Sequence, residues 1–420
     1  MLQITPLRYL GASLSFAPIG LYAFIMFSIR LLRSDSNKKI EVYLICGVIY
    51  TLLLSTICLF TLDNGGISTQ FLVSKLLNNV VLNVLIIYPM FLIPSPNGIF
   101  RLSVWGAFAV SLLGFLVIDV LQVPGLAPPS LFKLYWGVTS PSGFSLEQST
   151  FAATVTLLGL LCACITRSRA MRLFAITTVI LFALAVTQSK GTIICILLAL
   201  GLPFVQTNRQ GLALRFAALI VVGALAYLMV DVLADRFQAD LDDSTSSSTR
   251  SVFIFCSLVS TLFHPLGVGY ANYLPSLIEY TPTASEWMQK IFGISITLEE
   301  FYSYVGNDLK EGLNIKAQVF EYIMVFGLPG LAVMIIANVR LYRGLNRITS
   351  SERIPLLWLF WFLLLSALTY IPTNGLYVYS ICYGFLFTAA FRMNPAIRKD
   401  KGKPRSINHY ARSFTTLAAR

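Results

Sequence analysis

Long apolar runs recur along this chain, and each is about as long as a helix that crosses a lipid bilayer. The hydrocarbon core of a bilayer is about 30 Å thick, so a spanning helix needs about 20 consecutive apolar residues. A helix suits this setting because it satisfies its backbone hydrogen bonds internally. A transmembrane β-barrel needs alternating segments of about 10 residues instead, and the sequence does not show them. The runs therefore predict an all-α, polytopic transmembrane protein.

The placement of positive charge predicts the orientation of the spans. Lysines and arginines lie in short loops at alternate ends of the runs and in the tail, as the positive-inside rule describes. We expect about 11 spans, with the N-terminus outside and the C-terminus in the cytoplasm. The net charge of +12 then reports topology and not nucleic-acid binding. The predicted spans cover residues 10–29, 41–62, 70–93, 102–121, 149–165, 173–187, 191–206, 213–233, 317–338, 355–371 and 376–391.

One long polar segment interrupts the apolar runs. Residues 234–314 form a predicted large loop with short helices on the outer side, between transmembrane helices over 1–233 and 315–391. A basic cytoplasmic tail covers 392–420. We expect the chemistry in the loop, because polar side chains concentrate there. No glycine-rich nucleotide loop is present, and 2 histidines are too few for a histidine-rich metal site, so neither a metal nor a cofactor is predicted.

Lys190 is a candidate substrate-binding residue at the outer end of a span, in the sequence Gln-Ser-Lys-Gly over 188–191. A charged side chain at the bilayer centre costs roughly 2.5–3.5 kcal/mol, so one that is kept in a span is a functional candidate. A lysine can equally extend its ammonium group to the lipid headgroups. Both interpretations stay open.

Arg250 is a candidate for both catalysis and substrate binding. It follows a run of serines and threonines over 244–249, which predicts a helix start with Arg250 in the first turn. A guanidinium group at the membrane surface suits a diphosphate, because it binds phosphate oxygens in a bidentate manner. The alternative is an ion pair with Asp242 or Asp243 on the loop.

A glycine-rich turn over 264–273 begins His-Pro-Leu-Gly-Val-Gly. Glycine allows the backbone to approach a ligand closely, so Tyr270 and Asn272 are candidate substrate contacts, although a plain turn has the same composition. His264 is a candidate general base. A histidine before a proline is also a common helix-end residue, and that alternative stays open.

The stretch over 311–318 closes the loop and enters the next predicted span. Lys316 lies at the outer end of that span, and Gln318 is a candidate substrate contact on the following turn. Glu311 is a candidate carboxylate for catalysis. Glu321 falls inside the apolar run, so an ionised Glu321 must face protein or a cavity.

The order of these features resembles the O-antigen polymerase and ligase superfamily of bacterial envelope glycosyltransferases. The resemblance rests on the Gln-Ser-Lys-Gly turn, on Arg250 ahead of His-Pro-Leu-Gly-Val-Gly, and on the Gly-Leu-Pro-Gly sequence over 327–330. It covers about 174–334. Lys190 matches the basic residue that follows Gln-Ser in the family, and Arg250 matches the arginine that begins the loop helix. Lys316 departs from the family, which often has His-Asn at this point, and a protonated lysine cannot act as a base.

The resemblance implies transfer of a glycan from an undecaprenyl diphosphate carrier at the periplasmic face of the bacterial inner membrane, with no nucleotide sugar and no required metal. We expect a polymerase that joins lipid-linked repeat units into O-antigen, capsule or exopolysaccharide. Lys190, Arg250 and Lys316 would neutralise the departing diphosphate, and a carboxylate such as Glu311 or Asp308 would deprotonate the acceptor hydroxyl. A chain-length regulator is a possible protein partner.

Two alternatives remain at this stage. A ligase would transfer finished glycan to lipid A core or to protein and would differ only in its acceptor. A flippase for lipid-linked sugars would also need many helices, but transporters carry functional polar residues near the bilayer midplane. This chain places its polar residues in one outer loop, which favours an enzyme.

Overall fold

The structure, a computed structural model, is helical in every regular element of the residues it describes. The all-α prediction is therefore confirmed for those residues. The described residues are 29, 39–77, 79–80, 98–121, 148–187, 190–206, 245–293, 298–306, 313, 315, 317–348, 352–369 and 377–392. The predicted spans over 10–29 and 213–233 and the basic tail lie essentially outside them, so the count of eleven spans stays a prediction.

The helices coincide with most of the predicted apolar runs. π-helical turns extend three of them, at Leu116–Val120, Phe182–Thr187 and Thr388–Arg392. The helices are α2 (Lys39–Thr61), α4 (Gly98–Phe115), α6 (Gln148–Ile165), α7 (Arg169–Leu181), α8 (Lys190–Gln206), α10 (Thr245–Phe263), α11 (Tyr273–Phe292), α12 (Glu299–Gly306), α13 (Gln318–Asn346), α14 (Arg353–Thr369) and α15 (Tyr377–Phe387).

Several of these helices are suited to a membrane. Within the described residues, three are long and apolar enough to cross one, over Val42–Thr61, Gly98–Phe115 and Gln318–Asn346. Their apolar side chains are largely uncovered by protein: Phe60 on α2 is 81% exposed and Val333 on α13 is 67% exposed. Such faces are unfavourable in water and favourable against lipid. The chain is therefore a membrane protein.

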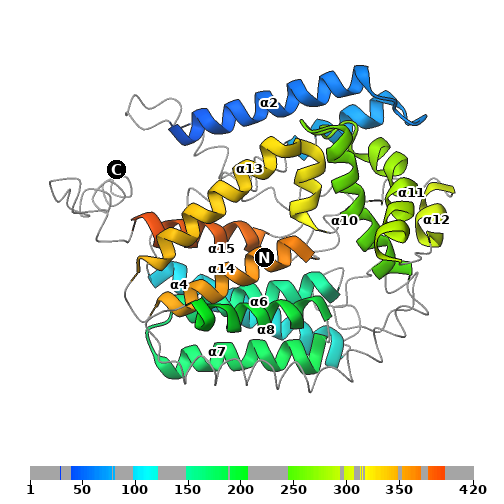
Figure 1. Cartoon of the computed structure of the whole chain (residues 1–420). Helices are drawn as coiled ribbons and strands as arrows, with labels where there is room; N and C mark the ends of the chain where they lie inside the picture. Colours follow the sequence, from blue (N-terminus) through cyan, green and yellow to red (C-terminus); the bar gives the residue numbers. More distant parts are fainter. Residues whose placement is uncertain are drawn as a thin grey trace.

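Two apolar cores organise the described part of the chain. The larger core surrounds α6, whose buried side chains face neighbours on all sides, as expected of a helix that is apolar all round. Helices α4, α7, α8, α14 and α15 pack around it. The smaller core joins α10, α11 and α12 to the region after α2 and to the start of α13. Figure 1 shows α10, α11 and α12 as a separate group at one end of the long helices.

Helix α13 connects the two cores and corrects one expectation. The sequence predicts one span over 317–338, but α13 consists of two helical segments that meet at Gly327, and its second segment continues to Asn346. Met324 and Val325 belong to the smaller core, whereas Leu341 and Leu345 belong to the larger one. Figure 1 shows the sharp bend in α13 between these parts. The second segment is about 28 Å long at 1.5 Å per residue, which is close to the thickness of a bilayer core.

Candidate active site

The break in α13 is filled by the glycine-rich turn after α10. Pro329 has no N–H group, so the carbonyl of Val325 cannot receive its usual helical hydrogen bond. The Gly269 N–H donates to that carbonyl at 3.0 Å, and the Val268 N–H donates to Met324 O at 3.0 Å. In return, the Leu328 N–H donates to Pro265 O at 2.8 Å. The two glycine motifs of the sequence are therefore joined through their backbones.

Glycine is required on both sides of this joint. Gly327 has φ 61° and ψ −153°, a region that only glycine occupies readily. A Cβ atom added there would lie 2.2 Å from Pro265 O, and one added at Gly267, with φ 91°, would lie 2.3 Å from Val325 O. These contacts are with backbone atoms, which cannot move aside as a flexible side chain can. The joint thus holds the turn at one fixed position against α13.

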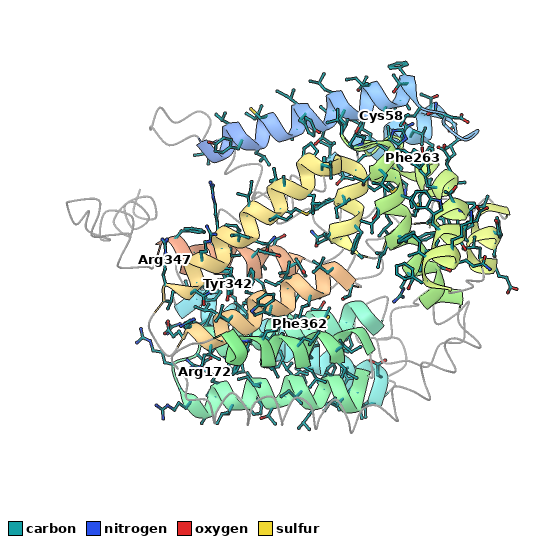
Figure 2. The ribbon with its side chains drawn as sticks, in the orientation of Figure 1. Cys58, Arg172, Phe263, Tyr342, Arg347 and Phe362 are labelled. Carbon is teal, nitrogen blue, oxygen red and sulfur yellow. The ribbon has the colours of Figure 1, made fainter. Side chains whose placement is uncertain are left out.

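Helix α2 holds the turn from the other side. The hydroxyl oxygen of Ser55, fully buried inside the apolar α2, accepts a hydrogen bond from the Tyr270 N–H at 2.9 Å. The Cys58 Sγ lies 3.8 Å from Gly267 O. Figure 2 shows Cys58 beside the end of α10, where Phe263 is labelled. The turn is therefore fixed between α2 and α13, and the ring of Tyr270 packs edge-on against Phe326 at 5.6 Å between centroids.

A second contact fixes the stretch that enters α13. Leu313, Ile315 and Ala317 are buried in the smaller core, and the Ile315 N–H donates to the hydroxyl oxygen of Tyr273 at 2.7 Å. Burial, together with the charge of Glu321, raises the pKa of Tyr273 well above its ordinary value. Glu321 is itself buried in the first turn of α13. The Tyr273 phenol and the side chain of Glu321 thus interact where the closing stretch meets α11.

Tyr273→Phe is expected to destabilise the protein by about 1–3 kcal/mol, because the buried Ile315 N–H loses its acceptor. The effect of pH has a defined sign. Above the ordinary tyrosine pKa, the unfolded chain ionises the Tyr273 phenol while the folded protein keeps it protonated. The stabilisation by the buried phenol is therefore fully present below the ordinary tyrosine pKa and decreases as the pH rises above it. Thermal unfolding in detergent at neutral and alkaline pH measures both effects. Tyr302→Phe, at a position that is 57% exposed, is the control and should leave the unfolding temperature at neutral pH unchanged.

The structure separates two residues that the sequence predicts to be catalytic. Arg250 lies in the second turn of α10 and not in the first turn as predicted, because the helix already begins at Thr245. His264 follows the last residue of the same helix, and the two Cα atoms are about 20 Å apart along its axis. The Nε2 atom of His264 lies 2.9 Å from the Tyr280 hydroxyl. Arg250 and His264 therefore cannot contact the same reacting atoms in this arrangement.

The remaining predicted residues fall into three groups. Tyr270 and Asn272 are buried at the turn, at the same end of α10 as His264. Gln318 begins α13, whose first turns pack in the smaller core. Lys190 begins α8, which packs in the larger core. Glu311 and Lys316 lie outside the described residues, so their roles stay predictions. Within the described residues, no group of three or more His, Cys, Asp or Glu side chains could hold a metal ion.

The sequence does not single out two positioning residues that the structure identifies. Ser55 lies within an apolar run, where one small hydroxyl carries no periodic signal. Tyr273 lies inside the turn that the sequence identifies, but nothing in its spacing indicates a bond to residue 315, forty-two positions away. A polar residue in the middle of a predicted span is the only hint for Ser55, because such a group needs a partner in the protein.

Comparison with known proteins gives one informative match. No protein-family model matches the chain. It is similar to a protein of Klebsiella pneumoniae described as an uncharacterized 49.5 kDa protein in the cps region, with 26% identity over 251 residues. The match covers 58% of this chain and 55% of that protein. The chain thus spans about half the length of this relative.

Proposed function

We propose that this protein is a membrane glycosyltransferase that polymerises undecaprenyl-diphosphate-linked repeat units at the periplasmic face of a bacterial inner membrane. The observation that carries the proposal is the backbone joint between the turn over 264–269 and the break at Gly327. It brings together the two glycine motifs on which the resemblance to O-antigen polymerases and ligases rests. The Klebsiella relative is described as a protein of the cps, or capsule, region, which supports a role in polysaccharide synthesis.

In the proposed reaction, a hydroxyl of the acceptor sugar attacks the anomeric carbon of the donor, and undecaprenyl diphosphate leaves with the bonding electrons. Arg250 binds the diphosphate and stabilises the charge that develops on it. Its Nε atom is buried and has no hydrogen-bond partner among the residues that the structure describes, so the guanidinium retains a free donor. Lys190 and Lys316 are proposed as further phosphate contacts, and Glu311 as the group that takes the proton of the acceptor hydroxyl.

A transporter is the alternative from a different class, and the break in α13 bears on it. Transporters use the free carbonyls of broken helices to coordinate ions. Here the carbonyls of Met324 and Val325 accept hydrogen bonds from Val268 and Gly269, so they are engaged within the protein. This observation favours the enzyme over an ion-coupled transporter.

Deletion of the gene, followed by gel analysis of lipid-linked and surface glycans, tests the proposal in the cell. A polymerase predicts that single lipid-linked repeat units accumulate and that long chains are lost. Full-length chains retained on the carrier lipid would instead identify a ligase. Units trapped at the cytoplasmic face would identify a flippase and contradict the proposal.

A further inference from the structure

Ser260 and Asn272 are fully buried polar residues whose side chains have unpaired atoms. Both residues have 0% of their surface exposed. The hydroxyl of Ser260 and both amide atoms of Asn272 have no hydrogen-bond partner in the described part of the chain. Asn272 is also the N-cap residue of α11, yet its side chain makes no capping bond. Buried polar groups are almost always paired, because an unpaired group has lost its hydration without compensation.

The helix hairpin places these two residues at the same level. Helices α10 and α11 are antiparallel, and the Sγ of Cys256 lies 3.8 Å from the carbonyl oxygen of Leu277. Ser260 lies one helical turn after Cys256, and the first turn of α11 lies one helical turn before Leu277. Ser260 is therefore level with the first turn of α11, which Asn272 immediately precedes. The Ser260 hydroxyl on α10 and the Asn272 amide at the start of α11 are therefore at the same level, near the closed end of the hairpin.

Other buried hydroxyls of α10 do have partners. The Ser257 hydroxyl donates to Ile254 O at 2.7 Å, and the Thr261 hydroxyl donates to Ser257 O at 2.7 Å. Both residues flank Ser260 on the same helix, so the helix can pair a buried hydroxyl with its own backbone. The unpaired state of the Ser260 hydroxyl is therefore a property of its position and not of α10 in general.

We propose that Ser260 and Asn272 form a subsite for a sugar ring of the substrate, with adjacent donor and acceptor groups such as two neighbouring hydroxyls or a hydroxyl beside an acetamido group. The chemistry matches because an asparagine amide presents one acceptor and one pair of donors side by side, and a serine hydroxyl offers both. The subsite is closed in this structure, so the sugar enters when the covering residues move. This inference rests on the proposed glycosyltransferase function.

The subsite also constrains the length of the substrate. Ser260 is ten residues after Arg250 on α10, which places the two about 15 Å apart along the helix axis. A molecule that contacts both the diphosphate site and this subsite is an extended oligosaccharide and not a monosaccharide. The subsite would thus select for a complete repeat unit, through contacts remote from the reacting atoms.

Asn272→Leu and Ser260→Ala test the proposal, because each replaces an unpaired polar group by an apolar one. Removing an unpaired buried group is expected to leave the unfolding temperature unchanged or to raise it by about 2–4 °C. Loss of the sugar contact is expected to reduce polymer formation at least tenfold. Ser257→Ala is the matched control, since its hydroxyl already has a partner, and it should leave polymer formation unchanged. Ser260→Ala keeps the test valid if Asn272→Leu does not fold.

Binding is measured separately from catalysis, with the lipid-linked units that accumulate in the deletion strain as the probe. The probe should raise the unfolding temperature of the wild type and not that of Asn272→Leu. Periodate, which cleaves neighbouring hydroxyls, should remove the effect if the subsite binds hydroxyls and preserve it if the subsite binds an acetamido group. Variants that bind and polymerise normally would overturn the subsite, as would variants that unfold more easily than Ser257→Ala. Wild type that binds the probe but makes no polymer would instead overturn the proposed function alone.

Discussion

Gly327→Ala is expected to destabilise the protein by more than about 3 kcal/mol, which is a large effect for the addition of one methyl group. The new Cβ atom would lie 2.2 Å from Pro265 O and 2.4 Å from Gly267 N. Relief of these contacts requires the turn to move away from α13, which breaks the hydrogen bonds that Val268 and Gly269 donate to α13. Loss of these bonds leaves buried carbonyls unpaired and adds to the strain at the positive φ of residue 327.

The measurement is thermal unfolding of the purified variant in detergent, together with its amount in the membrane. Gly106→Ala is the control, because Gly106 lies in helix α4 and a Cβ atom there has nothing within 4 Å. Alanine is a better helix former than glycine by about 0.5–1 kcal/mol, so this control should be neutral or slightly stabilising. A Gly327→Ala protein as stable as the wild type would show that the joint does not hold the turn.

Arg250→Ala is expected to reduce polymer formation about 100-fold or more, because it removes a positive charge from the proposed binding site of the departing diphosphate. Stability should change little, since the Arg250 Nε has no hydrogen-bond partner in the described structure that its removal would leave unpaired. Polymer formation by Arg250→Lys should lie between that of the wild type and that of Arg250→Ala, because lysine keeps the charge and loses the planar bidentate geometry. The readout is chain length on a gel at equal amounts of folded protein.

Lys290→Ala provides the matched control for Arg250. Lys290 is a cation on α11 in the same predicted loop, its side chain is 73% exposed, and it pairs with Glu286 at 3.9 Å. Exposed ion pairs of this kind contribute little to stability, so Lys290→Ala should leave the protein folded. If Lys290→Ala lowers polymer formation as much as Arg250→Ala does, the general positive charge of the loop matters and Arg250 has no specific role.

The helices could be predicted from the sequence because long apolar runs report them directly. The run over 149–165 became α6 with an offset of one residue, and the run over 191–206 became α8. The break at Gly327 could not be predicted in the same way. Its apolar pattern is continuous through Gly-Leu-Pro-Gly, and proline is tolerated within membrane helices when other groups pair the freed carbonyls. Those groups come from the turn some sixty residues earlier, which no local pattern reveals.

The candidate site was predictable as a set of residues but not as an arrangement. The sequence selects both glycine motifs, and the structure joins them. It also selects Arg250 and His264, but the thirteen positions between them are helical, so they lie about 20 Å apart along α10. The unpaired state of Ser260 depends on which neighbours surround it in space, and a serine at that position looks the same in sequence as the paired Ser257.

Reconstitution of the purified protein in lipid nanodiscs, with undecaprenyl-diphosphate-linked repeat units as the only sugar source, tests the proposed polymerase most directly. Chain length is read on a gel, with no nucleotide sugar added. The account predicts a ladder of products longer than one repeat unit with the wild type and essentially none with folded Arg250→Ala. Units that remain single, or that react only after lipid A core is added, would contradict it.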